Sequence, residues 1–231
     1  MILSKELVMS NKLLIIPDIH GRDFWIEPCS HINEFDKVVF LGDYHDPYTF
    51  QVSQETSRHR LRDNLLPFVL ENREKCVCLF GNHDGNYLVG AMADRFDRFH
   101  AEEIKKYLEQ LDLKLIYKVD KYLFSHSGVL PKWLDLYNLK LEDLETLPLT
   151  HSSLNEVSSY RGGFDVGSCI WGDVREYFTQ VHIPKIYQIF GHTQLDEEII
   201  KPDFACLDCR KAFVLDTETG DISEYGNQDN I

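Results

Sequence analysis

The residues best suited to chemistry lie in four short motifs, each placed directly after an apolar run. The motifs are DIHG at 18–21, GDYHD at 42–46, GNHD at 81–84 and GHT at 191–193. Each supplies carboxylate, amide or imidazole groups, which are common ligands of metal ions in proteins. A hydrolytic site with two metals needs such ligands and one residue that bridges both ions. One motif alone indicates a turn, whereas four together predict a dinuclear metal site.

The spacing of the motifs suggests how two ions would be shared. Asp18 and His20 leave the same strand and could reach one ion. Asp43 ends the next strand, where its two oxygens could contact both ions. The second ion would be completed by Asn82, His126 and His192. This mixture of oxygen and nitrogen donors predicts two divalent or trivalent ions of manganese, iron or zinc rather than magnesium or calcium.

The third motif also supplies a candidate acid for hydrolysis. His83 could protonate a leaving oxygen, and either Asp46 or Asp84 could orient its ring. Water or hydroxide bound between the ions would be the nucleophile, so no covalent phosphoenzyme is expected. Phosphoryl transfer also needs positive charge around the nonbridging oxygens, and Arg161 and Arg175 are candidates. For both arginines a solvated surface role has about equal weight.

The elements that position these motifs are predicted from apolar runs. Runs at 12–17, 37–41, 75–80 and 185–190 end at the four motifs and predict buried strands. Between the second and third runs, 52–74 has one apolar helical face, and Pro67 is expected to bend or interrupt this helix. Strand and helix alternate, which predicts parallel pairing with the motifs gathered at the carboxyl ends of the strands. Further strands are expected at 113–119, 122–125, 204–207, 212–215 and 222–225, which makes two sheets flanked by helices.

The chain is predicted to form a single domain over 1–231. Its length and 43% hydrophobic content suit one large core. The stretch 131–176 interrupts the series of strands with amphipathic and polar segments, and it predicts a helical cap or insertion over the site.

Composition limits the partners and the compartment. A net charge of −14 argues against stable binding of nucleic acid through its phosphates. No apolar run reaches the ~20 residues of a membrane span, and the N-terminus lacks the pattern of a secretory signal. The scattered cysteines are therefore expected to be free thiols in the cytoplasm. Cys206 and Cys209 have the spacing of half a zinc site or a redox pair, but structural roles are favoured. The histidines outside the candidate site are assigned to surface or packing roles, with His45 the least settled.

The ordered series DIHG, GDYHD, GNHD, HSG at 126–128 and GHT resembles the calcineurin-like metallophosphoesterase superfamily. It is most similar to the branch of protein serine/threonine phosphatases and bis(5'-nucleosyl)-tetraphosphatases. The resemblance covers 18–193 and implies an α/β (α+β) fold with two mixed β-sheets packed as a sandwich flanked by helices. It also implies that one metal is held by Asp18, His20 and Asp43, and the other by Asp43, Asn82, His126 and His192.

The sequence departs from this resemblance at several positions. Gln194 stands where many members have a second histidine, as the phosphatase-like branch does. Pro47 and Tyr48 stand where that branch has arginine and glycine, so an arginine expected to bind phosphate is missing. Pro17 replaces a common glycine, a change expected to be tolerated. The segment HSGVLPKW at 126–133 is similar to dinucleoside tetraphosphatases.

Together these features predict an enzyme, a metal-dependent phosphatase that attacks phosphomonoesters with metal-bound hydroxide. Phosphoserine and phosphothreonine are candidate substrates, so the expected partner is a phosphoprotein or a small phosphoester or nucleotide. The alternatives are a dinucleoside polyphosphate hydrolase or phosphodiesterase, and a noncatalytic metal-binding scaffold. The intact ligand set argues against the scaffold.

Overall fold

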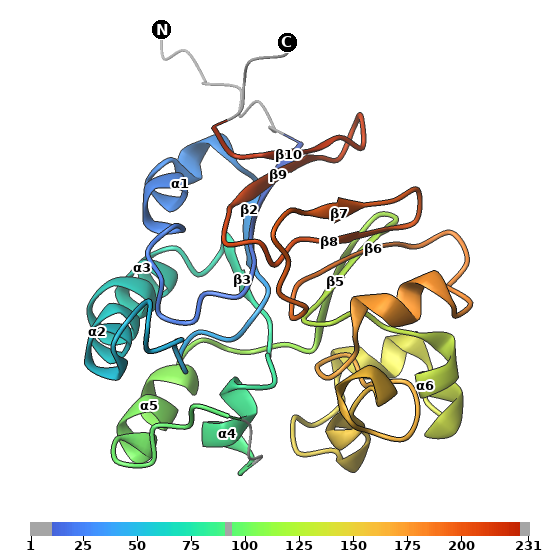
Figure 1. Cartoon of the computed structure of the whole chain (residues 1–231). Coiled ribbons are helices and arrows are strands. Elements are labelled where there is room, and N and C mark those ends of the chain that lie inside the picture. Colours follow the sequence, from blue (N-terminus) through green and yellow to red (C-terminus); the bar gives the residue numbers. More distant parts are fainter. Residues whose placement is uncertain (1–10, 91–93, 227–231) are drawn as a thin grey trace, which may run out of the picture.

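The computed structural model describes residues 11–90 and 94–226, and two five-stranded mixed sheets form the centre of this part of the chain (Figure 1). The first sheet has the order β10-β9-β1-β2-β3. Its strands are β1 (Lys12–Ile16), β2 (Lys37–Phe40), β3 (Cys76–Cys78), β9 (Phe213–Asp216) and β10 (Ile222–Glu224). The strands β1, β2 and β3 are parallel, and β9 and β10 close one edge in antiparallel pairing.

The second sheet has the order β4-β5-β6-β8-β7. Its strands are β4 (Ile116–Val119), β5 (Tyr122–Ser125), β6 (Tyr187–Phe190), β7 (Ile199–Ile200) and β8 (Phe204–Cys206). The central strands β5, β6 and β8 are parallel, while β4 and β7 are antiparallel edges. The prediction of two mixed sheets flanked by helices is confirmed.

The two sheets pack face to face, and alternation along the strands explains how. In β1, Leu13 and Ile15 point into the layer between the sheets, where they meet residues such as Phe124 and Ile189. Leu14 and Ile16 point to the opposite face and pack under the helices. Because both faces of the central strands are buried, their sequences are almost continuously apolar.

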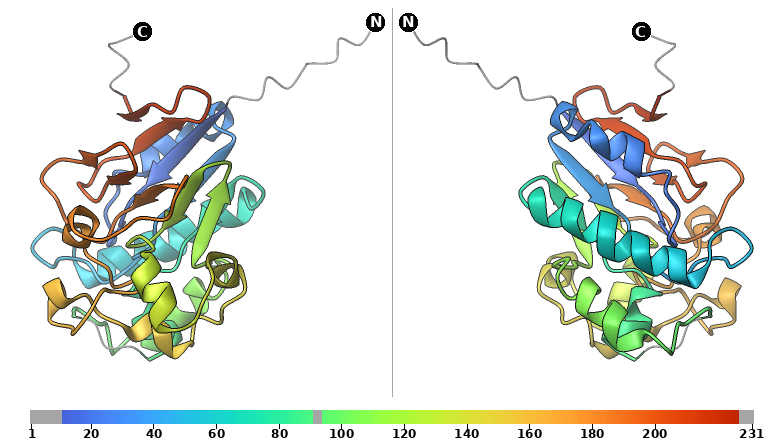
Figure 2. Two further views of the ribbon diagram at one scale, coloured as in Figure 1. Left: turned by 90° about the vertical axis from the view of Figure 1, so that its right-hand side faces the viewer. Right: turned by 90° about the vertical axis from the view of Figure 1, so that its left-hand side faces the viewer.

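Helices cover the outer face of the first sheet (Figures 1 and 2). They are α1 (Ile26–Ser30), α2 (Gln54–Arg60), α3 (Leu66–Glu71), α5 (Ala101–Leu108) and the short η1 (Ile32–Glu34), while α4 (Asp84–Leu88) follows the third motif. The segment η2 (Leu61–Leu65) is a π-helix that joins α2 to α3.

Pro67 does not interrupt the helix that was expected to bend or break there. The elements α2, η2 and α3 form one continuous helical rod, which the right-hand view of Figure 2 shows in teal. A proline has no N–H and its ring collides with the carbonyl four residues earlier in an α-helix. The wider turn of η2, closed by a hydrogen bond from the N–H of Leu66 to the carbonyl of Leu61, shifts the bonding pattern just before Pro67. We infer that the π-helical turn accommodates the proline.

The stretch 131–176 packs against the outer face of the second sheet. It begins with α6 (Pro131–Leu136) and continues as the short 3-10 helices η3 (Leu141–Glu145), η4 (Ser152–Asn155), η5 (Ser159–Arg161) and η6 (Val174–Phe178). Trp133 and Ile170 share one apolar cluster with Phe190 and Phe204 of the sheet. The stretch therefore shares its core with the sheet and is built from one α-helix and short 3-10 helices, and its role as a cap over the site stays a prediction.

The segment around Cys206 and Cys209 differs from a pair of strands joined by a simple turn. The strand before the turn, β8, belongs to the second sheet, and the strand after it, β9, belongs to the first. Cys206 and Cys209 are buried free thiols, and the Sγ of Cys206 lies 3.4 Å from the carbonyl of Gly191. Among the helices in the described ranges, none has the length and apolar character needed to cross a membrane.

Candidate active site

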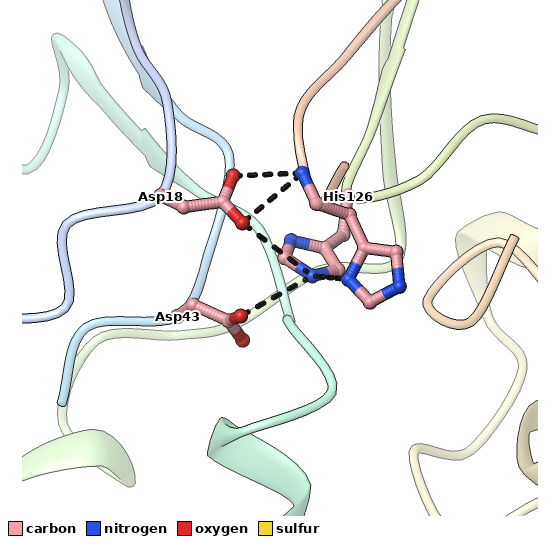
Figure 3. Close-up of side chains that lie close together, drawn as sticks. Asp18, Asp43 and His126 are labelled. Atoms are coloured by element: carbon pink, nitrogen blue, oxygen red, sulfur yellow. Dashed lines mark hydrogen bonds and ion pairs between the residues drawn. The ribbon is translucent and has the colours of Figure 1, made fainter. Parts of the chain in front are cut away.

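The polar motifs meet at the carboxyl ends of strands from both sheets. Backbone hydrogen bonds join their loops: the N–H of His20 donates to the carbonyl of Asp43 at 2.7 Å. The N–H of Gly191 donates to the carbonyl of His126 at 2.8 Å, which ties the ends of β5 and β6. Figure 3 shows the carboxyl groups of Asp18 and Asp43 side by side, facing the imidazole of His126. Segments far apart in the sequence thus converge on one point.

Two groups of potential ligand atoms lie at this point. Ligand atoms within 4.8 Å of one another come from Asp18, Asp43, His126 and His192 in one group, and from His20, Asp43 and His83 in the other. Asp43 belongs to both, as expected for a bridging carboxylate. Asp18 falls in the group of His126 rather than that of His20, so the prediction that Asp18 and His20 share an ion stays a prediction.

Backbone contacts orient two of the candidate ligands. The Nδ1 of His126 donates to the carbonyl of Leu41 at 2.7 Å, and the Nδ1 of His20 donates to the carbonyl of His45 at 3.0 Å. In these neutral tautomers Nε2 of each ring carries a lone pair, and it faces a carboxylate oxygen of Asp43 at 3.5 and 3.4 Å. A hydrogen bond from the other ring nitrogen to a carbonyl is typical of histidines that bind metal.

The arrangement of acceptor atoms tests whether a cation fits. The Nε2 of His126 lies 3.0 Å from the Oδ1 of Asn82 and 3.0 Å from the Nδ1 of His192. Because Nδ1 of His126 holds the proton, this Nε2 is an acceptor facing an acceptor oxygen, and the carboxylate of Asp43 lies beside it. Buried acceptors that converge in this way repel one another unless a cation lies between them. The residues therefore fit a metal ion.

Burial sets the protonation of these groups. Burial lowers the pKa of His20 and of His192 well below the ordinary value, so both rings are neutral and able to bind metal at neutral pH. Burial would raise the pKa of Asp43, but the facing imidazoles, His126 foremost, bring it to about 2. Burial raises the pKa of Asp18 to about 6, and the charge of Asp43 adds to this effect.

The loops hold several of these residues in an uncommon backbone conformation. His20, Asp43, Asp46 and His192 all have positive φ angles between 45° and 65°. Side chains of L-residues rarely adopt this region, which costs of order 1 kcal/mol or more for each. Strain of this kind is concentrated at functional sites because the surrounding structure maintains it.

His83 and Asp46 form the pair that the sequence suggested. The Nδ1 of His83 lies 3.0 Å from a carboxylate oxygen of Asp46, which is fully buried. Asp46 also accepts hydrogen bonds from Asn86, at 2.6 Å, and from the hydroxyl of Tyr87. Three donors fix its carboxylate and so fix the plane of the His83 ring.

Asp84, the competing partner for His83, serves the backbone instead. Its carboxylate accepts hydrogen bonds from the N–H groups of Asp43, Tyr44 and Gly81 at 2.8 to 3.1 Å. It therefore ties the second motif to the third. The sequence could not separate Asp46 from Asp84, because both follow a strand and both can reach the same loop.

The two candidate arginines occupy different positions. Arg161 donates to the hydroxyl of Thr193 at 3.0 Å and to the carbonyl of His192 at 3.3 Å, and it lines the pocket above the site. Its Nε lies 3.1 Å from the buried carboxylate of Asp173. Arg175 pairs with the other oxygen of Asp173 at 2.7 Å, is 55% exposed, and is not part of the pocket lining.

An arginine that was not singled out in the sequence also reaches the site. The guanidinium of Arg95 lies 3.7 Å from the ring centre of Tyr48, and its NH2 group lies 2.8 Å from the Nε2 of His83. It follows α4 in a segment with no periodic pattern, so no signal in the sequence marks it. Only the folding of the chain brings Arg95 close to the motifs.

One pocket of about 310 Å³ opens over the site. It is lined by His20, Asp43, Tyr48, Asn82, His83, Asp94, Arg95, Arg161, Trp171 and His192. Four of the six candidate ligands therefore share a cavity with the arginines Arg95 and Arg161.

The sequence profile of calcineurin-like phosphoesterases matches residues 12–195, which is most of the chain. The chain belongs to the calcineurin-like phosphoesterase family. Membership makes it a metal-dependent hydrolase of phosphoric esters, and the Asp and His groups described above fit the two metals that this family uses.

Solved phosphatase structures share the calcineurin-like fold of this chain. A cold-active protein-tyrosine phosphatase of the psychrophile Shewanella sp. matches with a TM-score of 0.60 and 15% identity over 92% of this chain and 80% of that chain. A protein serine/threonine phosphatase from Saccharomyces cerevisiae matches with a TM-score of 0.58 and 10% identity, over 97% of this chain and 82% of that chain. At these identities the likeness shows the fold alone. No curated protein matches the sequence.

The positions where this calcineurin-like chain departs from the expected pattern are also placed by the structure. Gln194 is exposed and is not part of the pocket lining. Pro47 is buried, and Tyr48 lines the pocket. Pro47 thus stands in place of the missing arginine, and Tyr48, in place of the glycine, stacks against the guanidinium of Arg95.

Proposed function

We propose that this protein hydrolyses phosphomonoesters, with phosphoserine and phosphothreonine in proteins as candidate substrates. The observation that carries the proposal is the pocket that four of the candidate ligands (His20, Asp43, Asn82 and His192) line together with Arg161. A phosphoryl group bound there would lie close both to candidate metal ligands and to a fixed positive charge. This is the arrangement that phosphoryl transfer requires.

Two metal ions would be held by Asp18, His20, Asp43, Asn82, His126 and His192. Once bound, they would lower the pKa of a water molecule and neutralise charge on the phosphate. The mixed oxygen and nitrogen donors favour manganese, iron or zinc.

His83 is positioned to act on the leaving group. Its Nδ1 is held by Asp46, so Nε2 is the nitrogen that faces the pocket. A proton on Nε2 could pass to the leaving oxygen, while the carboxylate of Asp46 stabilises the positive ring before the transfer. Tyr87 and Asn86 keep the carboxylate in place.

Arg161 is positioned to hold the phosphate. Its guanidinium is anchored by the buried carboxylate of Asp173, which is itself held by Arg175. Arg175 would therefore act through Asp173 and not on the substrate. An anchored guanidinium loses less freedom when it binds an anion, which favours tight and oriented binding.

The solved relatives support a substrate on a protein. Two of them are a protein-tyrosine phosphatase and a protein serine/threonine phosphatase, which favours a phosphorylated protein as the substrate here. The aromatic ring of Trp171 in the pocket lining favours one alternative, a nucleotide phosphoanhydride whose base could stack on it.

The free state of the cysteines, most of them buried, supports a reducing compartment such as the cytoplasm.

A panel of substrates tests the proposal. The protein, reconstituted with manganese, iron or zinc, is assayed with p-nitrophenyl phosphate, its bis ester, a phosphoserine peptide and diadenosine tetraphosphate. We expect the two monoesters to give the highest kcat/KM. A preference for the bis ester or for diadenosine tetraphosphate would contradict the proposal in favour of a diesterase or a dinucleoside polyphosphate hydrolase. Bound metal without any turnover would instead favour a noncatalytic scaffold.

A further inference from the structure

Arg95 is held over the pocket by an aromatic ring. Its guanidinium stacks on Tyr48 at 3.7 Å from the ring centre, close enough for a strong cation–π contact. Its backbone adopts a positive φ of 67°, and its carbonyl accepts a hydrogen bond from the side chain of Gln54 at 2.8 Å. Both the side chain and the backbone are therefore fixed at the rim.

The guanidinium of Arg95 makes few hydrogen bonds for a group that is held so firmly in place. Its Nε is buried and has no hydrogen-bond partner in the part of the chain that the structure describes. No ion pair of Arg95 occurs among the described residues either, and its NH2 group donates to the neutral acceptor Nε2 of His83. Guanidinium groups bind carboxylate and phosphate in pairs of parallel hydrogen bonds. The unused donors of Arg95 thus indicate an anion.

Arg22 also lies near the ring of Tyr48, but its guanidinium is hydrogen-bonded within the protein. Its guanidinium lies 5.3 Å from the centre of the Tyr48 ring, and its Nε donates to Gln51 at 2.9 Å and its NH1 donates to the carbonyl of Asp18 at 3.2 Å. Arg22 is therefore a structural contact and is not part of the pocket lining. Of the two arginines on Tyr48, Arg95 alone faces the pocket.

We propose that Arg95 binds the phosphate group of the substrate together with Arg161, which lines the same pocket. The proposal rests on the phosphomonoesterase activity proposed above. Before substrate binds, the guanidinium covers the Nε2 of His83. A phosphate dianion offers stronger acceptors, draws the guanidinium away from the imidazole, and leaves Nε2 facing the leaving oxygen. Binding of the correct anion thereby completes the site.

This arrangement makes the site selective for a terminal phosphate. A monoester carries two negative charges and three unesterified oxygens, so two guanidinium groups can both bind it. A diester carries one charge and two such oxygens, and it would gain much less from the second guanidinium. Arg95 is therefore expected to separate monoesters from diesters.

The test measures inhibition by inorganic phosphate in the full chain reconstituted with metal. We expect Arg95→Ala to raise the inhibition constant of phosphate by about 10- to 100-fold and to lower kcat/KM for p-nitrophenyl phosphate by a similar factor. Hydrolysis of the bis ester should fall by less than about threefold. Arg95→Lys should recover part of the phosphate affinity, because it keeps the charge but not the paired hydrogen bonds.

Variants of the ring and of a neighbouring arginine provide matched controls. Tyr48→Leu should weaken phosphate inhibition as Arg95→Ala does, whereas Tyr48→Phe keeps the aromatic face and should stay near wild type. Arg98→Ala removes an exposed charge outside the pocket and should leave the inhibition constant unchanged. Metal content and thermal unfolding are recorded for each variant to show that it is folded and loaded.

The outcomes separate this proposal from the proposed function. An inhibition constant within about twofold of wild type in folded Arg95→Ala would overturn the role of Arg95, whatever the substrate, since phosphate inhibition can be measured on any ester that is cleaved. Equal losses for the monoester and the bis ester would overturn the selectivity. A crystal structure with metal and inorganic phosphate should show the guanidinium on phosphate oxygens; a guanidinium still on His83 would overturn the exchange.

Discussion

Gly191 offers a sharp test of how Asp18 is held. A Cβ added at this position would lie 2.1 Å from the Oδ1 of Asp18, whereas ordinary contacts begin at 3.4 Å. The carboxylate would have to move by about 1.3 Å to reach such a contact. Both of its oxygens accept hydrogen bonds from the N–H of His192 at 3.0 Å, so this movement would also break those bonds.

The expected cost of Gly191→Ala follows from the displacement. A misplacement of about 1 Å in a catalytic group lowers rates by roughly 10²-fold. We therefore expect kcat for p-nitrophenyl phosphate to fall by about 10² or more and the bound metal, measured by inductively coupled plasma mass spectrometry, to fall below the wild-type content. The backbone of Gly191 does not have a positive φ, so the effect would come from the side-chain collision alone.

Gly226→Ala serves as the control for Gly191→Ala. Gly226 has a φ of 89°, and a Cβ there would meet nothing within 4 Å. Its substitution should cost about 1 kcal/mol of folding stability but leave metal content and kcat unchanged. Full metal content together with near-normal kcat in Gly191→Ala would refute the position inferred for Asp18.

Three further predictions concern the acid, the guanidinium anchor and a buried histidine. His83→Ala should lower kcat by about 10²- to 10⁴-fold while metal content stays near normal; a parallel loss of metal would make His83 a ligand instead. Asp173→Asn, which removes the charge that anchors Arg161, should raise KM for a monoester by about tenfold, whereas Arg175→Ala should change it by less than about twofold; the reverse order would place Arg175 on the substrate. Burial lowers the pKa of His45 to about 4, so between pH 6.5 and 4 a proton binds to the unfolded chain but not to the folded one. The free energy of unfolding should therefore fall by about 3 kcal/mol as pH drops through this window. A His45→Asn variant measured by urea denaturation should lack this part of the pH dependence. If the variant showed the same dependence of unfolding free energy on pH as the wild type, His45 would not be its source.

Much of the fold could be predicted because the strands carry a strong signal. The runs that became β1, β2, β3 and β6 are nearly continuous in apolar residues, since both faces of these strands are buried. Pairing between distant strands was harder to predict. The strands β8 and β9 are neighbours in sequence, but they belong to different sheets because the chain crosses the sandwich between them. Pro67 misled the helix prediction because a π-turn is set by packing rather than by residue type.

The sequence by itself determined which residues carry the chemistry. Asp18, Asp43, Asn82 and His192 each follow a strand, and the carboxyl ends of parallel strands gather in space, so the spacing of the motifs was enough to predict that they converge. Only the tertiary structure decided how the remaining groups are used. It paired His83 with Asp46, because Asp84 is occupied by backbone donors, and it brought Arg95 onto the ring of Tyr48. Contacts of this kind depend on loops with no periodic pattern, whose paths are fixed by long-range packing and not by their own sequence.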